Sequence, residues 1–366
     1  MNDEENMLSN KILNVDDERV NSIHKRSIII DTHCDTLIHL SPRPPLSVYL
    51  SHYFNFPREY TGADLGPLLK YPGNKGLGER SENLSVDFVK MAEGGQTCQV
   101  FSMWMEPEYK PERCVLRTMQ MVDTFQSELE RNRSVAMLAT SAGDIAKAKK
   151  AGKVAAMLSV ESGGDAIQGD LSVLRVLYRL GLRIFGLTYN RRNMLADGFA
   201  ENRTRGGLTE LGVQTIEECN RLGIIVDVSH IGETSFYDVL DASKAPIIAS
   251  HHGLRALHDT PRYMTDDQAR ALAEKSGVIG VMYGIGPKTL GDVVDHIDHA
   301  VEVGGIGCVG LGSDWDGGCR PEGLEDSSKL PNLTRELVAR GYRDDEVEKI
   351  LGGNLMRVFK RVLRKG

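Results

Sequence analysis

Eight short apolar runs recur along the 366-residue chain, and each is followed by a polar or glycine-rich loop and then by a stretch with helical spacing. The runs are rich in β-branched residues and are continuous rather than alternating, which is typical of parallel strands buried on both faces. Eight such units predict a (β/α)8 barrel. The runs are SIIID (27–31), CQVFSMW (98–104), VAAMLSVE (154–161), IFGLTY (184–189), IIVDVSH (224–230), APIIASH (245–251), GVIGVMYG (277–284) and CVGLGSD (308–314).

The segments between the runs carry helix signals. Residues 171–181, 209–223 and 266–277 place apolar side chains three to four residues apart, and each of the three ends in glycine. A doubly wound sheet is the alternative architecture. It is disfavoured because no G-x-G-x-x-G follows a strand, and the glycines of GGIGCVG (304–310) lead into a strand instead of leaving one.

We expect one catalytic barrel domain that spans residues 1–366. Residues 1–24 form an N-terminal extension, and residues 315–366 form a C-terminal loop and helices. Residues 36–97 are longer than one helix requires, so they are expected to hold an insertion besides the first helix. An insertion that follows the carboxyl end of a barrel strand commonly builds part of the active-site rim.

Composition excludes several classes of protein. Hydrophobic residues make up 41% of the chain, enough for a large core, and the net charge of −7 without a basic stripe argues against nucleic acid. No apolar run reaches the ~18 residues of a membrane span, and the acidic first residues lack the apolar region of a signal peptide. Six cysteines without a C-x-x-C pair predict reduced thiols in a cytoplasmic protein.

Side chains that can bind metals stand where apolar runs stop. In a (β/α)8 barrel these strand ends converge on one face, so residues far apart in the chain would share one pocket. Imidazoles and carboxylates together suit Zn²⁺ or a similar divalent ion. Any one of these residues alone would be read as a structural hydrogen-bonding group; the joint pattern predicts a metal centre. The residues are His33, Asp35, Glu161, His230, His251 and Asp314.

Spacing refines this prediction near the first strand. In an extended segment, His33 and Asp35 point to the same side and can reach one ion, whereas Cys34 points away. Asp31 lies deeper and is expected to be a structural acid. Three histidines and three acids exceed the ligands of one tetrahedral zinc, which suggests two metals with Glu161 central enough to bridge them.

Six segments of the chain together form a recognisable pattern. They are IIDTHCDT (29–36), LSVESGGD (158–165), GIIVDVSHIGETSFYDVL (223–240), APIIASHHGLRAL (245–257), VGLGSDWDGGCRPEGLEDSSKLPNL (309–333) and ILGGNLMRVF (350–359). These segments resemble the membrane (renal-type) dipeptidases, zinc peptidases within the metal-dependent amidohydrolase superfamily. The resemblance runs from about residue 27 to residue 361, and the two C-terminal segments are the most specific. No lysine ends the third or fourth strand, and Glu161 fits the dipeptidase branch.

The resemblance implies a (β/α)8 barrel with two zinc ions per chain. His33 and Asp35 would hold one zinc, His230 and His251 the other, and Glu161 would bridge them.

It also implies a mechanism. A metal-bridged hydroxide would attack the peptide carbonyl, and Asp314 would move the proton to the leaving amine. Arg262, in TPRYMTDD, matches the family arginine that binds the substrate carboxylate.

The sequence departs from the family pattern at two positions. Tyr189 stands where the renal-type enzymes carry a histidine that polarises the substrate carbonyl, and Cys34 stands where asparagine is common. A neutral phenol can still donate a hydrogen bond to a developing oxyanion. The change at Tyr189 therefore bears on substrate range more than on hydrolysis.

Three functions remain open from the sequence. The first is a binuclear zinc dipeptidase of the cytoplasm, with family resemblance allowing a D-residue at the C-terminal position of the substrate. The second is an amidohydrolase-type enzyme for another amide, lactam or N-acyl amino acid. The third, a non-catalytic barrel that binds a small molecule, is disfavoured because all six predicted metal-site residues are present. The sequence does not determine the oligomeric state; a homodimer is the prior, because dimers are common among such barrels.

Overall fold

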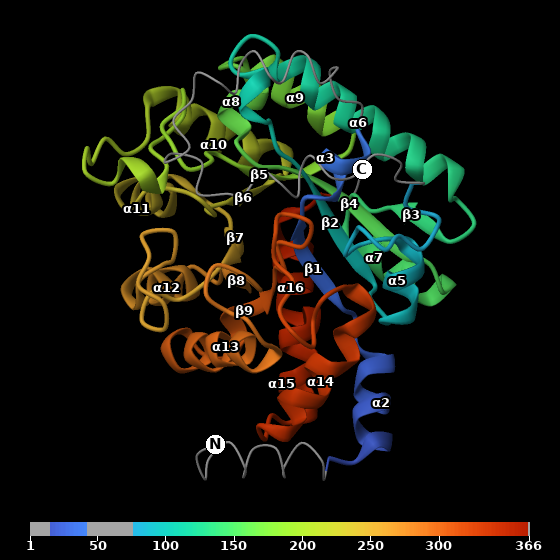
Figure 1. Ribbon diagram of the computed structural model, residues 1–366. Coiled ribbons are helices and arrows are strands. Elements are labelled where there is room, and N and C mark those ends of the chain that lie inside the picture. The colour runs from blue at the N-terminus through green and yellow to red at the C-terminus, as the bar shows by residue number, and fades with distance from the viewer. Residues whose placement is uncertain (1–14, 42–75, 365–366) are drawn as a thin grey trace.

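The computed structural model, which describes residues 15–41 and 76–364, shows a closed barrel of eight parallel strands surrounded by helices (Figure 1). Neighbouring strands follow one another around the barrel, and the last strand, β9, pairs with the first, β1. The predicted (β/α)8 fold is confirmed. The barrel strands are β1 (Ile30–Cys34), β2 (Cys98–Met103), β4 (Val154–Val160), β5 (Leu182–Gly186), β6 (Ile225–Asp227), β7 (Ile248–His252), β8 (Val278–Val281) and β9 (Val309–Leu311).

A ninth strand, β3 (Ala136–Leu138), was not predicted. It pairs in parallel with residues 154–156 of β4 and belongs to the same sheet. The edge of β4 has room for it because β5 pairs only with residues 158–160 of that strand.

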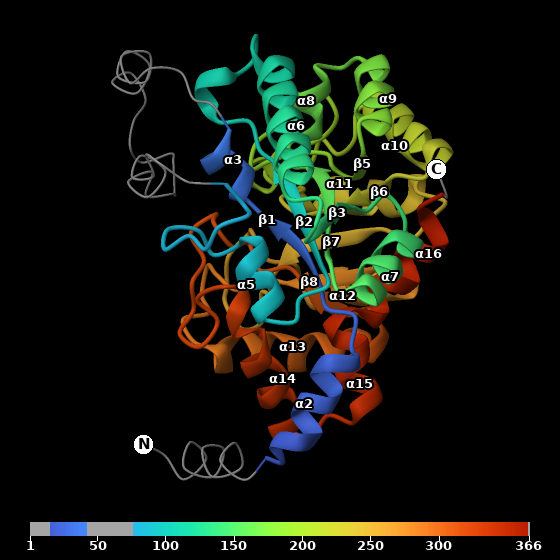
Figure 2. The ribbon, with the colours of Figure 1, turned by 90° about the vertical axis from the view of Figure 1, so that its right-hand side faces the viewer.

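The helices cover the outside of the barrel (Figures 1 and 2). The three segments predicted as helical contain α9, α10 and α12. The helices are α2 (Asp17–Arg26), α3 (Thr36–Leu40), α5 (Phe88–Glu93), α6 (Cys114–Arg131), α7 (Ala142–Ala151), α8 (Gly163–Ile167), α9 (Leu171–Arg179), α10 (Glu210–Leu222), α11 (Glu233–Ala242), α12 (Asp266–Glu274), α13 (Leu290–Gly304), α14 (Leu330–Ala339), α15 (Asp344–Glu348) and α16 (Asn354–Val362).

Local sequence explains where these helices begin and end. The Thr209 hydroxyl accepts a hydrogen bond from the Gly212 amide at 3.0 Å at the start of α10, and Gly223 ends that helix with a φ of 81° that favours glycine. A reciprocal capping box between Thr265 and Gln268 starts α12. Both helices then pack against the barrel, α10 on β6 and α12 on β8, and this burial contributes more stability than helix propensity does.

The amino-terminal end of the barrel is closed by α16. Its apolar side chains, such as Leu355 and Phe359, share one buried cluster with residues near the start of the strands, including Ile30, Ile225 and Val278. Burial of a Leu or Phe side chain contributes about 1.5–3 kcal/mol, so α16 is a substantial part of the core. The opposite, carboxyl-terminal end carries the polar residues.

Segments outside the repeating unit pack against the barrel. In the part of the N-terminal extension that the structure describes, α2 packs on α14 and α15. Figure 2 shows β1 rising from α2 towards α3. The proline-punctuated part of the predicted insertion lies outside the described residues, whereas the segment after residue 76 leads into α5 as expected.

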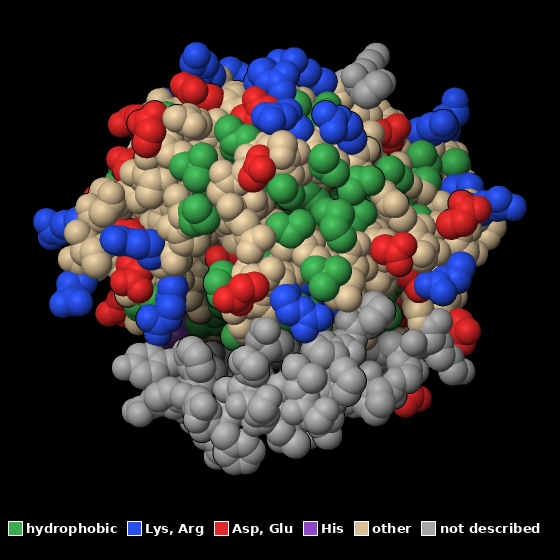
Figure 3. All heavy atoms as spheres, turned by 90° about the horizontal axis from the view of Figure 1, so that it is seen from above, with side chains coloured by type: hydrophobic (Ala, Val, Ile, Leu, Met, Phe, Trp, Pro, Cys, Tyr) green, Lys and Arg blue, Asp and Glu red, His purple; other side chains and the backbone are tan. Residues whose placement is uncertain are grey.

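The surface and the thiols agree with the composition. All six cysteines lie in the described residues, and they are buried and form no disulfide, as predicted. Figure 3 shows hydrophobic side chains near the centre of one face and charges of both signs around its edge; Leu116 of α6 and Val176 of α9 are among the exposed hydrophobic residues. Among the helices of residues 15–41 and 76–364, none combines the length and the hydrophobicity of a membrane-spanning segment.

Candidate active site

The predicted site residues meet at the carboxyl-terminal ends of the strands. They come from β1, β4, β5, β6, β7 and β9 and from the segments that follow these strands. Most of these side chains are buried, although Asp314 and Tyr189 are partly exposed. The residues are His33, Asp35, Glu161, Tyr189, His230, His251, Arg262 and Asp314.

The first strand differs from the expectation. It begins at Ile30 rather than Ser27, and His33 lies inside it, next to an irregularity in the pairing with β2. Asp35 is no longer extended but precedes α3, with φ −96° and ψ 17°. We predicted that His33 and Asp35 point to the same side because both lie in one extended segment. That holds for His33, which lies in β1, but not for Asp35. Cys34 does point away, and it lies in the hydrophobic core.

His33 faces three carboxylates. Its Nε2 atom lies 3.6 Å from Asp35 Oδ1, 3.6 Å from Asp314 Oδ1 and 3.8 Å from Glu161 Oε2. The groups His33–Asp35–Asp314 and His33–Glu161–His251 each bring their ligand atoms within 4.8 Å of one another. Such a concentration of buried oxygen and nitrogen atoms can hold a divalent cation.

A second group forms around the other oxygen of Glu161. Glu161 Oε1 lies 2.6 Å from His230 Nε2 and 3.6 Å from His251 Nε2, and the two Nε2 atoms are 2.8 Å apart. Glu161 therefore lies between His33 on one side and the two remaining histidines on the other.

Neighbouring polar groups determine which nitrogen of each ring faces the site. His230 Nδ1 lies 2.7 Å from Asn190 Oδ1, and His251 Nδ1 lies 2.9 Å from Ser250 Oγ. If both Nδ1 atoms donate in these contacts, both Nε2 atoms present lone pairs to each other and to Glu161. Lone pairs and a carboxylate oxygen at such distances repel unless an electrophile lies between them.

Two further observations fit a cation at this place. Among the described residues, His33 Nε2 and Asp35 Oδ1 are buried without a hydrogen-bond partner, although buried polar atoms are rarely left unpaired. Gly317 also leaves space beside the acids: a Cβ atom there would lie 2.6 Å from Asp35 Oδ2 and 2.7 Å from Asp314 Oδ1. The residues present therefore fit a bound metal.

The acids and imidazoles shift one another's pKa values. Burial opposes a charge on the His33 ring, but the nearby carboxylates of Asp35, Glu161 and Asp314 outweigh it and raise the pKa of His33 to about 10. Burial raises the pKa of Asp314 to about 7, and the charge on His33 counters part of that effect. Burial also lowers the pKa of His230 and of His251, so both rings are neutral and can act as ligands.

The backbone turns sharply where two of these residues lie. His230 and Asp314 adopt φ values of 64° and 59°, in the left-handed region that residues other than glycine seldom occupy. Each lies three residues beyond its strand, β6 or β9. Backbone strain of this kind is concentrated at functional sites.

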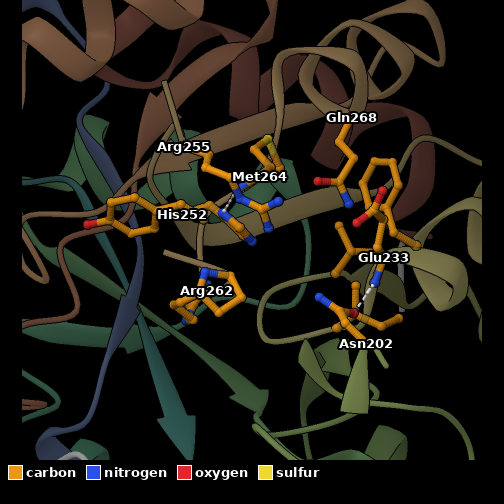
Figure 4. Close-up of a pocket in the computed structure, with 12 residues that line it drawn as sticks. Asn202, Glu233, His252, Arg255, Arg262, Met264 and Gln268 are labelled. Atoms are coloured by element: carbon orange, nitrogen blue, oxygen red, sulfur yellow. Dashed lines mark hydrogen bonds between the residues drawn. The ribbon is translucent and has the colours of Figure 1, made fainter. Parts of the chain in front are cut away.

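Arg262 lies in the loop between β7 and α12 and is only 3% exposed. Its Nη2 group donates to the carbonyl oxygen of His251 at 2.9 Å and lies 3.1 Å from His230 Nε2. Within the described chain its Nε and Nη1 groups are buried without a partner. Figure 4 shows the pocket beside it, where His252 accepts a hydrogen bond from the Met264 amide instead of joining the site.

Tyr189 lies beside the histidines. Its ring centroid is 4.5 Å from that of His230 and 5.3 Å from that of Trp104. Burial and the charges of Glu161 and Asp35 raise the pKa of the phenol above its usual value, so Tyr189 stays a neutral donor.

Sequence reasoning did not find the residues that orient the histidines. Asn190, Ser250 and Asp227 were not singled out, although a serine precedes each of His230 and His251 in the sequence. The repeated Ser-His pair is the one sequence feature that could have pointed to residues that orient the histidine rings. Asp31 was predicted to be a structural acid, and it accepts hydrogen bonds from the amides of His33 and Ser313.

Comparisons with known proteins identify the family of the chain. The model of the membrane dipeptidase family, peptidase family M19, matches residues 17–365. The chain is 35% identical over 299 residues to the uncharacterised dipeptidase C965.12 of Schizosaccharomyces pombe, an alignment that covers 75% of this chain and 71% of that protein. It is 34% identical over 252 residues to dipeptidase verJ of Clonostachys rogersoniana, covering 67% of this chain and 65%, just under two thirds, of that protein.

A solved structure is similar over almost the whole barrel. The metallopeptidase of Rhodobacter sphaeroides, liganded with a phosphinate mimic of the dipeptide L-Ala-D-Ala, aligns with a TM-score of 0.75 and 25% identity, covering 92% of this chain and 99% of that one. Barrel, polar cluster and relatives together define a metal-dependent hydrolase. The chain belongs to the membrane dipeptidase family, peptidase family M19.

Proposed function

We propose that this protein is a binuclear zinc dipeptidase. The observation that carries the proposal is the position of Glu161, whose two oxygens face His33 on one side and His230 and His251 on the other. In this arrangement His33 and Asp35 would hold one ion, His230 and His251 would hold the second, and Glu161 would be shared between the two groups of ligands.

Zinc ions bound there would activate a water molecule and polarise the scissile carbonyl. Asp314 accepts the proton of the attacking water and returns it to the leaving amine. A group in this role must accept and release a proton near neutral pH, and the burial that raises the pKa of Asp314 to about 7 suits it for that exchange.

Two other residues bind the substrate in this proposal. Arg262 offers its unpartnered Nε and Nη1 groups to the C-terminal carboxylate of the dipeptide. Tyr189 donates a hydrogen bond to the oxygen on which negative charge develops. The Rhodobacter relative binds a mimic of L-Ala-D-Ala, which supports dipeptides with a C-terminal D-residue as candidate substrates for this chain.

A second candidate is kept because of Tyr189. An amidohydrolase-type enzyme acting on another amide, a lactam or an N-acyl amino acid would use the same metal-binding residues with a differently shaped pocket. Tyr189 is bulkier than a histidine and packs against Trp104, so it changes the wall beside the reacting carbonyl.

The test counts zinc and measures cleavage. Purified protein is analysed for bound zinc and assayed with a panel of L,L- and L,D-dipeptides before and after chelation, together with lactam and N-acyl amino acid substrates. About two zinc ions per chain and chelator-sensitive dipeptide cleavage are expected. Bound zinc with turnover of only the other substrates would favour the second candidate. Protein that binds no zinc when it is supplied would contradict both.

A further inference from the structure

We propose that Asp227 and Ser250 form a relay that fixes which nitrogen of the His251 ring carries the proton. The inference deepens the proposed function and rests on it, because it concerns how His251 is prepared to bind a cation. Asp227 is the last residue of β6, and Ser250 precedes His251 on β7. All three side chains are at least nine-tenths buried.

The hydrogen of the Ser250 hydroxyl has two possible acceptors other than the ring. Asp227 Oδ2 lies 2.5 Å from Ser250 Oγ, and Ser229 Oγ lies 3.2 Å from it. The Asp227 oxygen is closer, and the two backbone amides that donate to Oδ1 orient the carboxyl group as an acceptor, so Oδ2 receives the hydrogen. The Ser250 oxygen is then left as an acceptor for His251 Nδ1, which is 2.9 Å away. His251 Nδ1 therefore carries the ring proton, and Nε2 keeps its lone pair for the metal.

Asp227 also holds the backbone of the site. Its Oδ1 atom accepts the amides of Ser229 at 3.0 Å and Ser250 at 2.8 Å, the residues just before His230 and His251. One buried carboxylate thus fixes the ring proton of His251 and the chain beside both histidines. Asp227 is a positioning residue, since it lies behind the metal ligands. Such partners commonly change metal affinity by about 10–100-fold when they are replaced.

Asp31 provides a matched comparison within the same chain. It is equally buried, and it likewise accepts the amide two residues ahead, that of His33, together with the amide of Ser313 on the neighbouring segment. The Gln99 side chain also donates to its carboxylate, and the Ser313 hydroxyl lies beside it but donates to the His33 carbonyl oxygen and to no imidazole. Asp31 therefore shares the burial, charge and backbone bonds of Asp227 but not the relay through a hydroxyl to an imidazole.

The decisive variant is Asp227→Asn. Its Oδ1 atom can still accept both backbone amides, so the local fold is retained. Its amide nitrogen, however, donates to Ser250 Oγ, which leaves the Ser250 hydrogen with His251 Nδ1 at 2.9 Å and Ser229 Oγ at 3.2 Å as acceptors. The imidazole nitrogen is closer, and Ser229 Oγ already accepts the His251 amide, so the hydrogen turns towards His251 Nδ1. The ring proton is forced to Nε2, where it blocks the metal.

Two measurements follow. In metal-depleted full-length protein, nitrogen-15 NMR of the histidine rings should show the proton of His251 on Nδ1 in the wild type and on Nε2 in Asp227→Asn. Competition with a chromophoric zinc chelator should show that Asp227→Asn weakens the second zinc by about 10–100-fold. Ser250→Ala, which removes the hydroxyl, should weaken that zinc without moving the proton to Nε2 by this route.

Asp31→Asn is the control for the loss of a buried charge, and it should bind the second zinc within a few-fold of the wild type. The relay is wrong if the proton stays on Nδ1 in Asp227→Asn, or if Asp31→Asn weakens zinc as much as Asp227→Asn does. The proposed function is judged separately by wild-type zinc content and dipeptide cleavage. If these fail, the NMR measurement on metal-depleted protein still decides whether the relay exists.

Discussion

Replacing Arg262 by lysine tests whether this residue binds the C-terminal carboxylate of a dipeptide. Lysine keeps the positive charge but loses the planar pair of donors. In the structure, Nη2 is already engaged by the carbonyl oxygen of His251, whereas Nε and Nη1 are buried and have no partner in the described chain. Two donors are therefore available for a ligand.

The expected magnitude follows from those two donors. A hydrogen bond to a charged group contributes about 1.5–3 kcal/mol, so two of them contribute about 3–6 kcal/mol to binding the carboxylate. The wild type should therefore prefer a dipeptide over its C-terminal amide by about 10²–10⁴ in kcat/KM. Arg262→Lys can retain one bond, so this preference should fall by about 10–150-fold.

The assay compares kcat/KM for one dipeptide and its amide in the wild type and in the variant. This double comparison isolates the contact between residue 262 and the carboxylate. Arg255→Lys is the control, because Arg255 lines the same pocket but points its Nε group at the Thr260 carbonyl, and it should leave the preference unchanged. Equal losses on both substrates would refute the reasoning and would leave Arg262 as a support for the His251 backbone.

Three further predictions concern the site. Asp314→Asn should keep its zinc content but lose about 10²–10⁴ in kcat; near-full activity would contradict the proton transfer. Tyr189→Phe should lower kcat about 10²–10³-fold with little change in KM, and an unchanged kcat would exclude Tyr189 as an oxyanion donor. In the wild type, the phenol should add no alkaline limb to the pH profile of activity, because burial raises its pKa. Zinc binding at pH 8 should release a proton from His33, because Asp35 and Glu161 help to raise its pKa to about 10 despite burial. The affinity for zinc should therefore rise about tenfold with each pH unit below that pKa. Calorimetry in buffers of different ionisation enthalpy measures this release, and none would contradict the assignment.

The sequence predicted the barrel because its signal is repeated eight times. Continuous apolar runs identify buried parallel strands whatever their exact ends, so a shift such as that of β1 from Ser27 to Ile30 does not change the fold. β3 escaped prediction because it is only three residues long and exists where β5 leaves part of β4 unpaired. That space is a property of the assembled sheet.

The sequence also predicted which polar side chains would meet, because parallel strands end together at one face of a barrel. It could not predict their orientation. Contacts such as that of Asn190 with His230 join residues 40 positions apart and depend on a left-handed turn at His230. Serine, asparagine and aspartate are also common as caps and turn residues, so nothing in their local sequence marks them as partners of an imidazole.

The pairing of β1 with β9 has a consequence for synthesis of the chain. His33 is among the first site residues to leave the ribosome, and Asp314 follows 281 residues later, which takes about 15–60 s at ordinary translation rates. During that interval the barrel cannot close and the polar cluster is incomplete. The candidate ligand set therefore cannot be complete before β9 and Asp314 have been synthesised, and a product truncated before Val309 would carry several of the candidate ligands without the closed barrel that brings them together.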